Sequence, residues 1–373
     1  MPVPLDEYPV HQVPLSMAYV ATSDRNAYDR CYVNAHDCTG NLFLVSGLGV
    51  YPNLGVTDAF ITVMRSGCQS TLQLSDALEG DRMSPSQRVG PYHIEVVEPL
   101  RRIRLVCEPG ELGIGLDLLW TGSFPAIDEP LHTIRAGGRI ILDGARFAQV
   151  GTCDGVVHLD GEDFRLESGS SIGTRDRSWG IRPVGESEPA GRSAAEPATG
   201  FGFWWTYVPL RFDDFALVVI AQEDGDGTRT TAEAVRVWPA EARRPPEQLG
   251  WADIDIHYRS GTRLPEGATI TMRKGGSPTI VSIETLGYVL LSAGPGYNGD
   301  PGWSHGRWSG RGWSARVDAD LSDPALAGQM AFGVIDHVAR ATCDGSVGYG
   351  LFEHASFGRH APSGFDSWES VAP

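Results

Sequence analysis

Residues 41–64 read NLFLVSGLGVYPNLGVTDAFITVM, which is an apolar run, a turn and a second apolar run. Short apolar runs separated by Gly, Pro and Asn are typical of two β-strands joined by a hairpin. Residues 202–222 read GFWWTYVPLRFDDFALVVIAQ and repeat this plan, and in each segment the second run begins with an aspartate close to a phenylalanine. The repetition predicts an internal duplication that gives two antiparallel β-units. The alternative is a chance similarity between two β-hairpins.

Apolar or alternating runs of strand length recur along the chain, whereas helical periodicity is scarce. Many short antiparallel strands without helices predict an all-β protein made of barrels or sandwiches. Outside the two segments quoted above, the runs span residues 93–98, 103–107, 114–120, 139–142, 146–152, 156–159, 234–238, 253–258, 268–273, 279–285, 287–292, 313–319, 333–342 and 347–355.

Two Asp-Gly pairs stand between such runs, at Asp154-Gly155 and at Asp344-Gly345. A two-residue hairpin of type I′ needs a positive φ at both central residues, and Asp-Gly meets this need. Both pairs therefore predict a tight hairpin.

The length of 373 residues favours about two domains. We expect the first β-unit to cover residues 1–145 and the second to cover residues 146–373. The stretches 184–199 and 242–250 contain many turn-forming and polar residues and are predicted to be exposed loops. Neither stretch resembles a long flexible linker, so the two units are expected to pack against each other.

The composition excludes several classes of protein. Trp, Tyr and Phe total 34 and can fill a sizeable core, so the chain is not wholly disordered. We expect neither a membrane span nor a secretion signal, because no apolar run approaches about 20 residues and no basic region precedes an apolar block. The formal net charge of −17 repels phosphate groups, which argues against nucleic acid and anionic membranes as partners. Six cysteines without a CxxC pair predict reduced thiols in a cytoplasmic protein.

Signatures of metal and nucleotide sites are scarce. The chain contains neither the GxxxxGK[ST] phosphate loop nor HExxH, and its ten histidines show no HxH or HxxxH spacing. His36, Asp37 and Cys38 are adjacent, but neighbours on a strand point to opposite faces and cannot all close on one ion. We therefore expect no metal and no cofactor.

The most unusual cluster is GTRDRSWGIR at residues 173–182, which combines three Arg with one Asp and one Trp. In a strand, Asp176 would point to one face, and Arg175 and Trp179 would point to the other. A carboxyl group in a dry barrel interior would have a raised pKa and could donate a proton. The alternative is a buried Arg–Asp network that ties the two domains together.

A second cluster is aromatic, with Trp205 and Tyr207 in one run and Trp308 in PGWSHGRWSGRGW, residues 301–313. Such side chains suit a hydrophobic ligand and could stabilise a developing carbocation by cation–π contact. His305 would be the polar group among these aromatic side chains. The alternative is that these aromatic residues are ordinary core.

Glu353 and His354 are neighbours in GYGLFEHASFG, near the C-terminal end of the chain. Because strand neighbours face opposite ways, only one of the two can point inward. We favour Glu353 as a second functional carboxyl group.

At these motifs the chain resembles a known superfamily. The run GTRDRSWGIR is similar to the D-H-x-W-G segment of the carotenoid hydratase (hydroxyneurosporene synthase) family and its two-domain lipocalin-like relatives. The segments GLGVYPNLGVTDAF, VGPYHIEVVEPLRRIRL, GIGLDLLWTG, HGRWSGRGW, DHVAR and GYGLFEH resemble a bacterial branch of that superfamily. The resemblance implies two packed calycin-type antiparallel barrels with an apolar pocket near the domain interface. Relatives hydrate isoprenoid double bonds or cyclise polyenes.

Carried over residue by residue, the family's aspartate falls on Asp176 and its tryptophan on Trp179. Arg177 stands where the hydratases have a histidine. The hydratases also use a tyrosine and an aspartate about 25 residues after the tryptophan, and here that stretch, residues 204–207, has a tyrosine but no carboxylate. The resemblance thus implies the fold more firmly than it implies simple carotenoid hydration.

We therefore expect a protein that binds a small hydrophobic molecule, isoprenoid- or polyketide-like, in a β-barrel pocket. The enzyme hypothesis is acid-assisted hydration, dehydration, isomerisation or cyclisation, with Asp176 or Glu353 as the proton donor. The alternatives are a carrier without turnover and a structural module whose aromatic residues only form core. A homodimer is a possible assembly. The side chains expected to hold the substrate are Arg175, Trp179, Trp205, Tyr207, His305 and Trp308.

Overall fold

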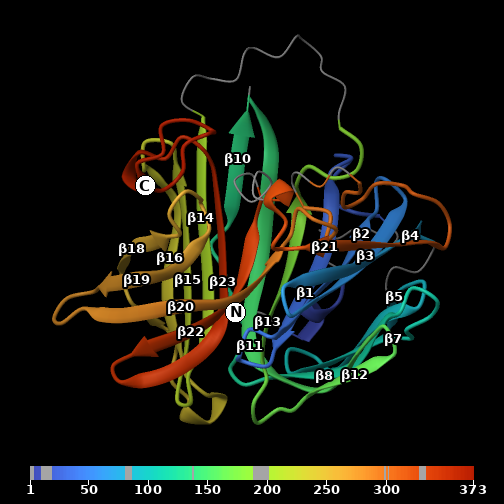
Figure 1. Cartoon of the computed structure of the whole chain (residues 1–373), viewed down its shortest axis with the longest axis horizontal. Coiled ribbons are helices and arrows are strands. Elements are labelled where there is room, and N and C mark those ends of the chain that lie inside the picture. The colour runs from blue at the N-terminus through green and yellow to red at the C-terminus, as the bar shows by residue number, and fades with distance from the viewer. Residues whose placement is uncertain are drawn as a thin grey trace.

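The computed structural model describes residues 4–9, 19–79, 86–136, 138–187, 201–297, 300, 302–326 and 333–373. Within these residues the chain forms two antiparallel sheets of fourteen and nine strands, which we name sheet A and sheet B. Figure 1 shows sheet B on the left and sheet A on the right. The prediction of an all-β protein with two packed antiparallel units is confirmed. In the described ranges, no helix has the length and apolar character that crossing a membrane requires.

Sheet A follows the order β21-β4-β3-β2-β1-β13-β11-β8-β7-β6-β5, and the short strands β9, β10 and β12 pair with β11. Its strands are β1 (Ala27–His36), β2 (Leu42–Tyr51), β3 (Val56–Arg65), β4 (Cys68–Ala77), β5 (Ser86–Val89), β6 (Tyr92–Glu98), β7 (Arg102–Cys107), β8 (Ile114–Gly122), β9 (Ile127–Asp128), β10 (His132–Ala136), β11 (Arg139–Leu159), β12 (Glu162–Leu166), β13 (Ile172–Ile181) and β21 (Trp313–Asp320).

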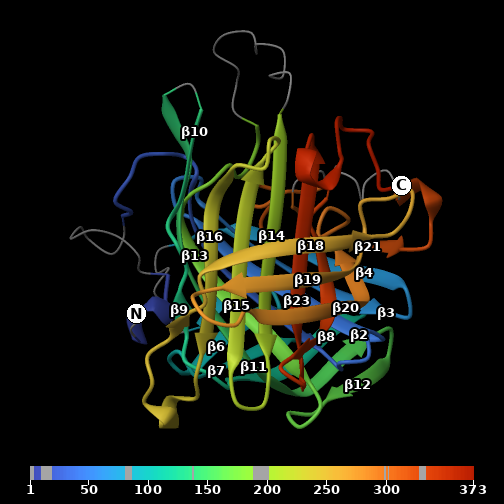
Figure 2. The ribbon, with the colours of Figure 1, turned by 90° about the vertical axis from the view of Figure 1, so that its left-hand side faces the viewer.

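Sheet B follows the order β17-β16-β15-β14-β23-β22-β20-β19-β18. In Figure 2, β18, β19 and β20 cross in front of β14 to β16, so this sheet curls over itself into a half-barrel. Its strands are β14 (Gly202–Arg211), β15 (Ala216–Asp224), β16 (Arg229–Val237), β17 (Glu247–Gln248), β18 (Trp251–Tyr258), β19 (Pro265–Arg273), β20 (Thr279–Leu290), β22 (Ile335–Cys343) and β23 (Ser346–Gly358). The described residues also contain three short 3₁₀ helices: η1 (Pro4–Glu7), η2 (Ala240–Ala242) and η3 (Ala361–Ser363).

The two hairpins quoted from the sequence are β2–β3 and β14–β15, and each is hydrogen-bonded along its strands. Residue 145 lies inside β11, all of which belongs to sheet A. The chain passes to sheet B between Ile181 and Gly202, and it returns once to add β21 to the edge of sheet A beside β4. Much of the predicted loop 184–199, namely residues 188–199, lies outside the described residues.

One of the two predicted Asp-Gly hairpins is present. Asp344 and Gly345 have φ values of 50° and 83° and join β22 to β23. The prediction for Asp154-Gly155 is wrong, because β11 runs through this pair while β8 pairs with it on one side. The turn follows at Asp160, which joins β11 to β12.

Apolar side chains gather in three main clusters. One fills the interior of the sheet A half-barrel, a second fills the interior of the sheet B half-barrel, and a third contains residues of both sheets. The third cluster includes Val45 and Phe60 from sheet A and Val218 and Leu351 from sheet B. The interiors of both half-barrels are therefore packed with apolar side chains.

Candidate active site between the sheets

Strand alternation on β13 separates the predicted residues. Asp176 is paired in register with Tyr32 of β1 and with Ala148 of β11, both of which belong to the apolar cluster shared by the two sheets. Asp176 therefore faces sheet B. Arg175 and Arg177 point the opposite way, into the half-barrel of sheet A.

The two buried arginines have partners inside that half-barrel. Arg175 binds Glu7 through two hydrogen bonds of 2.5 and 2.8 Å and also donates to Gln149. Arg177 donates to Asp29 at 2.8 Å. This network fixes η1 to the inside of sheet A and does not include Asp176. The structure thus places Arg175 away from the face that carries Asp176.

On sheet B, Glu353 of β23 lies in register with Tyr207 of β14 and with Asp336 of β22. Trp205 donates its indole N–H to Glu353 at 2.5 Å. Tyr32 of sheet A donates its hydroxyl to Asp336 at 2.5 Å, a bond that bridges the two sheets. The structure thus brings Glu353, Trp205 and Tyr207 together opposite Asp176.

Arg146 of β11 occupies the middle of this space. Its guanidinium is paired with Glu129, which follows β9. The same guanidinium lies 5.5 Å from the ring centre of Trp205 and 5.2 Å from that of Tyr207. His132 of β10 stacks on Trp205 with ring centres 6.1 Å apart. Arg146 therefore connects an acid of sheet A with aromatic rings of sheet B.

Four buried carboxyl groups share this space, and their electrostatics favour the protonated form. Burial raises the pKa of Asp176 to about 6 and that of Glu129 to about 7, although Arg146 lowers both. Burial and then Glu353 raise the pKa of Asp336 well above its usual range, and burial raises the pKa of Glu353. Several acids that lie close together cannot all ionise in a medium of low polarity. We call these four groups the carboxyl cluster: Asp176, Glu129, Asp336 and Glu353.

Asp176 differs from the other three acids. The described residues form no hydrogen bond and no ion pair with its carboxyl group. Like Glu353, it is partly accessible although it lies between two sheets. The hydroxyl of Tyr207 is also buried without a hydrogen-bond partner among the described residues. These two polar groups are therefore available to a bound molecule.

A cavity of about 600 Å³ lies near the C-terminal end of β13, and the carboxyl cluster is not part of its lining. It lies where the start of β1 and the end of β13 meet the segment between β20 and β21, and His305 and Tyr297 line it. His305 is buried, and burial together with the Arg30 charge holds its pKa well below the usual value, so the ring is neutral. His305 is the one predicted ligand-binding residue that lines this cavity.

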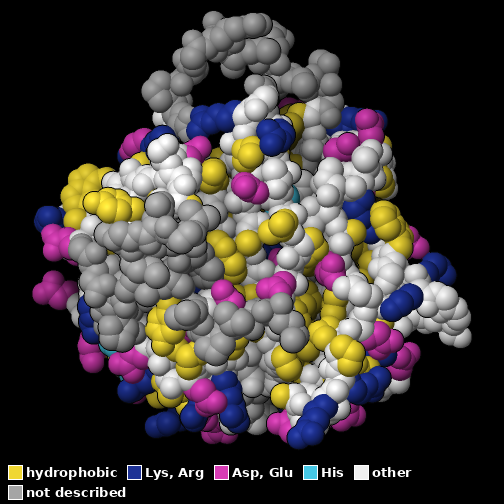
Figure 3. Space-filling model, turned by 180° about the vertical axis from the view of Figure 1, so that it is seen from behind, with side chains coloured by type: hydrophobic (Ala, Val, Ile, Leu, Met, Phe, Trp, Pro, Cys, Tyr) yellow, Lys and Arg dark blue, Asp and Glu magenta, His cyan; other side chains and the backbone are white. Residues whose placement is uncertain are grey.

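Two predicted residues lie elsewhere. Trp179 shares the strand face of Arg175 and Arg177 and lies in register with Asp29, so it points away from Asp176. Trp308 is 50% exposed on the surface. Figure 3 shows one face of that surface, where basic and acidic side chains are interspersed.

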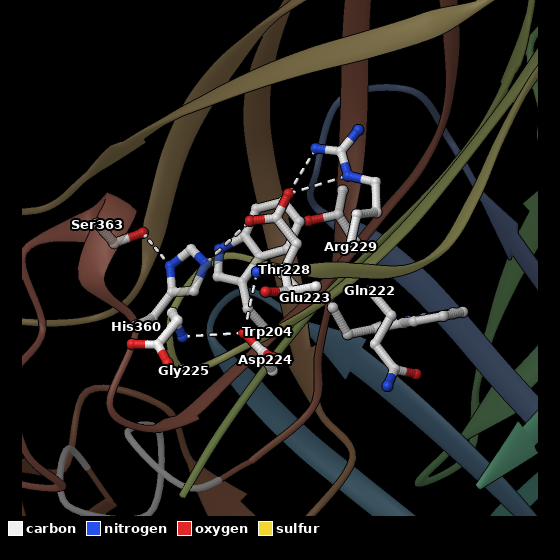
Figure 4. A network of polar contacts seen from close by, with 12 residues as sticks. Trp204, Gln222, Glu223, Asp224, Gly225, Thr228, Arg229, His360 and Ser363 are labelled. Carbon is white, nitrogen blue, oxygen red and sulfur yellow. Dashed lines mark hydrogen bonds and ion pairs between the residues drawn. The ribbon is translucent and has the colours of Figure 1, made fainter. Parts of the chain in front are cut away.

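A further polar network lies on the other side of β14 and β15 (Figure 4). His360 contacts Ser363 at 2.8 Å and Glu223 at 3.2 Å, and Glu223 also pairs with Arg229. Gln222 points away from this network, toward the side of Trp205. The order serine, histidine and carboxylate resembles a hydrolase triad. However, Arg229 already neutralises the carboxylate, and Ser363 lies only three residues from His360 in one tight turn, so we interpret this network as structural.

Sequence reasoning missed Tyr32, Glu129, Arg146 and Asp336. Asp336 lies within the segment DHVAR, which the resemblance had singled out without giving it a role. Glu129 and Arg146 are 17 residues apart and carry no motif. Only the pairing of β9 with β11 brings them together, and a single sequence does not reveal that pairing.

The two curled antiparallel sheets define a lipocalin-like two-barrel β-fold, here with four buried carboxyl groups between the sheets. The chain belongs to a family described as "Family of unknown function (DUF8625)", whose model matches residues 3–366. No curated protein matches the sequence.

Two solved structures show the same fold. A putative AttH from Nitrosomonas europaea is 14% identical, with 95% of this chain and 98% of that chain covered and a TM-score of 0.55. Kievitone hydratase from Nectria haematococca is 12% identical, with 97% of this chain and 95% of that chain covered and a TM-score of 0.51. At these identities the likeness concerns the fold.

Proposed function

We propose that this protein binds a small unsaturated hydrophobic molecule between its sheets and protonates one of its carbon–carbon double bonds. The overall reaction would be a hydration, dehydration, isomerisation or cyclisation. The carboxyl cluster carries this proposal, because its raised pKa values keep a carboxylic acid protonated near neutral pH. The fold that this chain shares with a hydratase supports it.

Asp176 is the proposed proton donor, because its carboxyl group is accessible and has no partner among the described residues. Its proton would form a C–H bond with the π electrons of the double bond and leave a carbocation on the neighbouring carbon. The Asp176 carboxylate formed in this step would stabilise that cation.

The fate of the cation defines the product. Water can attack it while Glu353 takes the proton that the water loses, which completes a hydration, and the reverse sequence is a dehydration. Loss of a proton from a different carbon gives an isomer. Attack by a second double bond, followed by proton loss, gives a ring. Each outcome needs one acid and one base, and the carboxyl cluster supplies both.

Trp205 acts in this scheme through its neighbours. His132 stacks on its ring, Arg146 lies over the ring, and its indole N–H holds Glu353. Trp205 is therefore proposed as a positioning residue for Glu353 and Arg146. Tyr207, with its free hydroxyl, is the proposed contact for a polar group of the substrate.

The test uses deuterium. The protein is incubated in D₂O with an extract of apolar small molecules from its host, and the products are analysed by mass spectrometry. A proton donor that exchanges with solvent places deuterium on carbon in hydration, isomerisation and cyclisation, and a dehydration shows the same label when it runs in its reverse, hydrating direction. We expect new species with one C–D bond, formed by the wild-type protein and lost in Asp176→Asn.

Native mass spectrometry of protein purified from the same host identifies any small molecule that co-purifies with it. A molecule that is bound without deuterium uptake, by wild type and Asp176→Asn alike, would contradict the enzyme proposal and favour a carrier. The matched control is Asp213→Asn, since Asp213 lies on an exposed turn with 96% of its side chain accessible. This control should incorporate deuterium as the wild type does.

A further inference from the structure

The cavity beside His305 carries positive charge, which is unusual in a chain with a net charge of −17. Four of its lining residues are arginines and only two are acids. The arginines are Arg25, Arg139, Arg182 and Arg307, and the acids are Glu186 and Asp300. The volume of about 600 Å³ is within the range of small-molecule sites.

Acids neutralise only part of this charge. Arg139 pairs at 3.4 Å with Asp24, which lies outside the lining. Glu186 pairs with Arg307 at 2.9 Å, and Arg25 donates to the backbone carbonyl of Glu186, which is not charged. Asp300 instead accepts hydrogen bonds from backbone N–H groups, among them that of Gly296 at 3.2 Å. A net positive charge therefore remains in the lining.

Arg182 is the arginine best placed to bind a ligand. Its guanidinium lies 5.5 Å from the ring centre of Tyr28, and the described residues form no ion pair with it. It lines the cavity and also acts electrostatically on Asp176 and Glu353. Arg182 thus connects the cavity with the carboxyl cluster.

Arg30 adds a second, fully buried cation beside the cavity. Its guanidinium donates to the hydroxyl of Tyr297 at 3.3 Å and lies 3.0 Å from Nε2 of His305, both neutral groups. The described residues place no carboxylate in direct contact with it, and its Nε–H has no hydrogen-bond partner. The buried carboxyl group of Asp58 acts electrostatically on Arg30 and lies 3.9 Å from Nδ1 of His305, so Arg30 has an acid nearby but no direct ion pair with it.

Small residues of β13 and β11 lie between the cavity and the carboxyl cluster. Register pairs Ser178 with Arg30 and Arg146, and it pairs Gly180 with Tyr28 and Gly144. Ser178, Gly180 and Gly144 are all partly accessible. Arg182 directly follows β13 and is six residues from Asp176, which corresponds to on the order of 20 Å between their backbones in extended chain.

We propose that the ligand is an amphipathic acid, with an anionic head group held in the cavity by Arg182 and an unsaturated apolar body that extends along β13 toward Asp176. The position of the reacting double bond rests on the proposed function. The selection of the head group does not, because it needs only the cavity and its arginines.

Pairs of probes that differ only in the head group test this inference. All-trans-retinoic acid is compared with retinol, and farnesoic acid with farnesol, by quenching of tryptophan fluorescence. A charge-assisted hydrogen bond to a carboxylate predicts that at least one acid binds about 10- to 100-fold more tightly than its alcohol. Arg182→Gln should remove most of this difference and leave the affinity for the alcohol unchanged.

Two controls separate the possible failures. Arg273→Gln removes an exposed arginine of sheet B, 62% accessible, and should bind as the wild type does. Asp176→Asn should keep the preference for the acid even though it cannot donate a proton. The inference is overturned if neither acid binds more tightly than its alcohol, or if Arg182→Gln weakens both probes equally. Deuterium uptake into a neutral compound would then still support the proposed chemistry.

Discussion

Asp176 and Arg175 are adjacent in sequence but have different roles, because strand alternation sends them to opposite sides of sheet A. Asp176 has no hydrogen bond to lose within the described residues. We predict that Asp176→Asn melts within a few degrees of the wild type while it abolishes deuterium incorporation. Thermal unfolding followed by circular dichroism measures the first effect. A collapse of the fold in this variant would instead indicate a structural role for Asp176.

Glu7, unlike Asp176, is a buried carboxyl group whose oxygens have hydrogen-bond partners. It binds Arg175 through both of its oxygens and also accepts the backbone N–H of Leu100 at 2.7 Å. Glu7→Gln leaves the buried Arg175 cation without a counter-charge, so we expect a loss of about 3–5 kcal/mol in the free energy of unfolding. Urea denaturation provides the measurement. Glu98→Gln, in an exposed pair with Arg101, should cost less than about 1 kcal/mol.

At the scale of single residues, the sequence allowed the choice of Asp176 and Glu353 because both stand in strand-like runs rich in unusual neighbours. It also indicated that Asp176 and Arg175 face opposite sides. It could not indicate that Arg175 would find Glu7, since Glu7 lies far away in the chain. The partners of buried charges are set by packing between distant segments, and one sequence carries no record of that packing.

At the scale of elements, the apolar runs of the sequence predict many of the strands, but β1 is a strand that they do not predict. β1 reads AYDRCYVNAH and was not predicted, yet all ten of its residues are buried. Its polar side chains Arg30, Tyr32 and Asn34 face the space between the sheets and have polar partners there. Polar and apolar side chains therefore alternate in residues 30–36 as a strand requires, but the polar face is buried against the second sheet instead of facing solvent.

Gly155, where the Asp-Gly pair predicts a turn, instead lies within β11 and close to the backbone of β8. Gly155 has a φ of 141°, and a Cβ atom built on it would lie 2.1 Å from the carbonyl oxygen of Asp117 in β8. We predict that Gly155→Ala costs about 2–4 kcal/mol, because the added methyl group collides with the backbone of the next strand. Gly161→Ala is the matched control in the true turn, where φ is also positive but no atom lies within 4 Å. It should cost about 1–2 kcal/mol. Equal losses in the two variants would contradict this account.

For the whole molecule, the buried acids predict how stability depends on pH. The pKa of Asp176 is raised to about 6, and those of Glu129 and Asp58 to about 7. The folded state therefore keeps protons that the unfolded state releases near pH 4, so these groups favour folding at low pH and this contribution is lost as the pH rises through 6 to 7. We predict a higher melting temperature at pH 5 than at pH 8.

Two comparisons check this prediction. Asp176→Asn should reduce the difference between the melting temperatures at the two pH values, because one titrating group is gone. Below about pH 4 the trend should reverse, since the Glu7 pKa is lowered by Arg175 and that pair is lost when Glu7 is protonated. A melting temperature that rises steadily from pH 5 to pH 8 would show that the carboxyl cluster is not buried as described.

The rate of the proposed reaction should depend on pH through the protonation of Asp176. A general acid with a pKa of about 6 loses activity as the pH rises above that value. We predict that the rate of deuterium incorporation falls about tenfold per pH unit above this range. Rates measured from pH 5 to pH 9 provide the check, and a rate that rises with pH would point to a base as the group that begins the reaction.

The return of β21 to sheet A has a consequence for how the protein is made. β21 pairs along β4 from Trp313 to Asp320, after most of sheet B has been synthesised. During synthesis on the ribosome, the outer edge of β4 therefore emerges early and remains unpaired until β21 is translated. An open edge of this kind recruits strands from other nascent chains, so expression at low temperature or with chaperones should raise the yield. For the same reason, the two sheets cannot be produced as separate halves by a single cut in the gene.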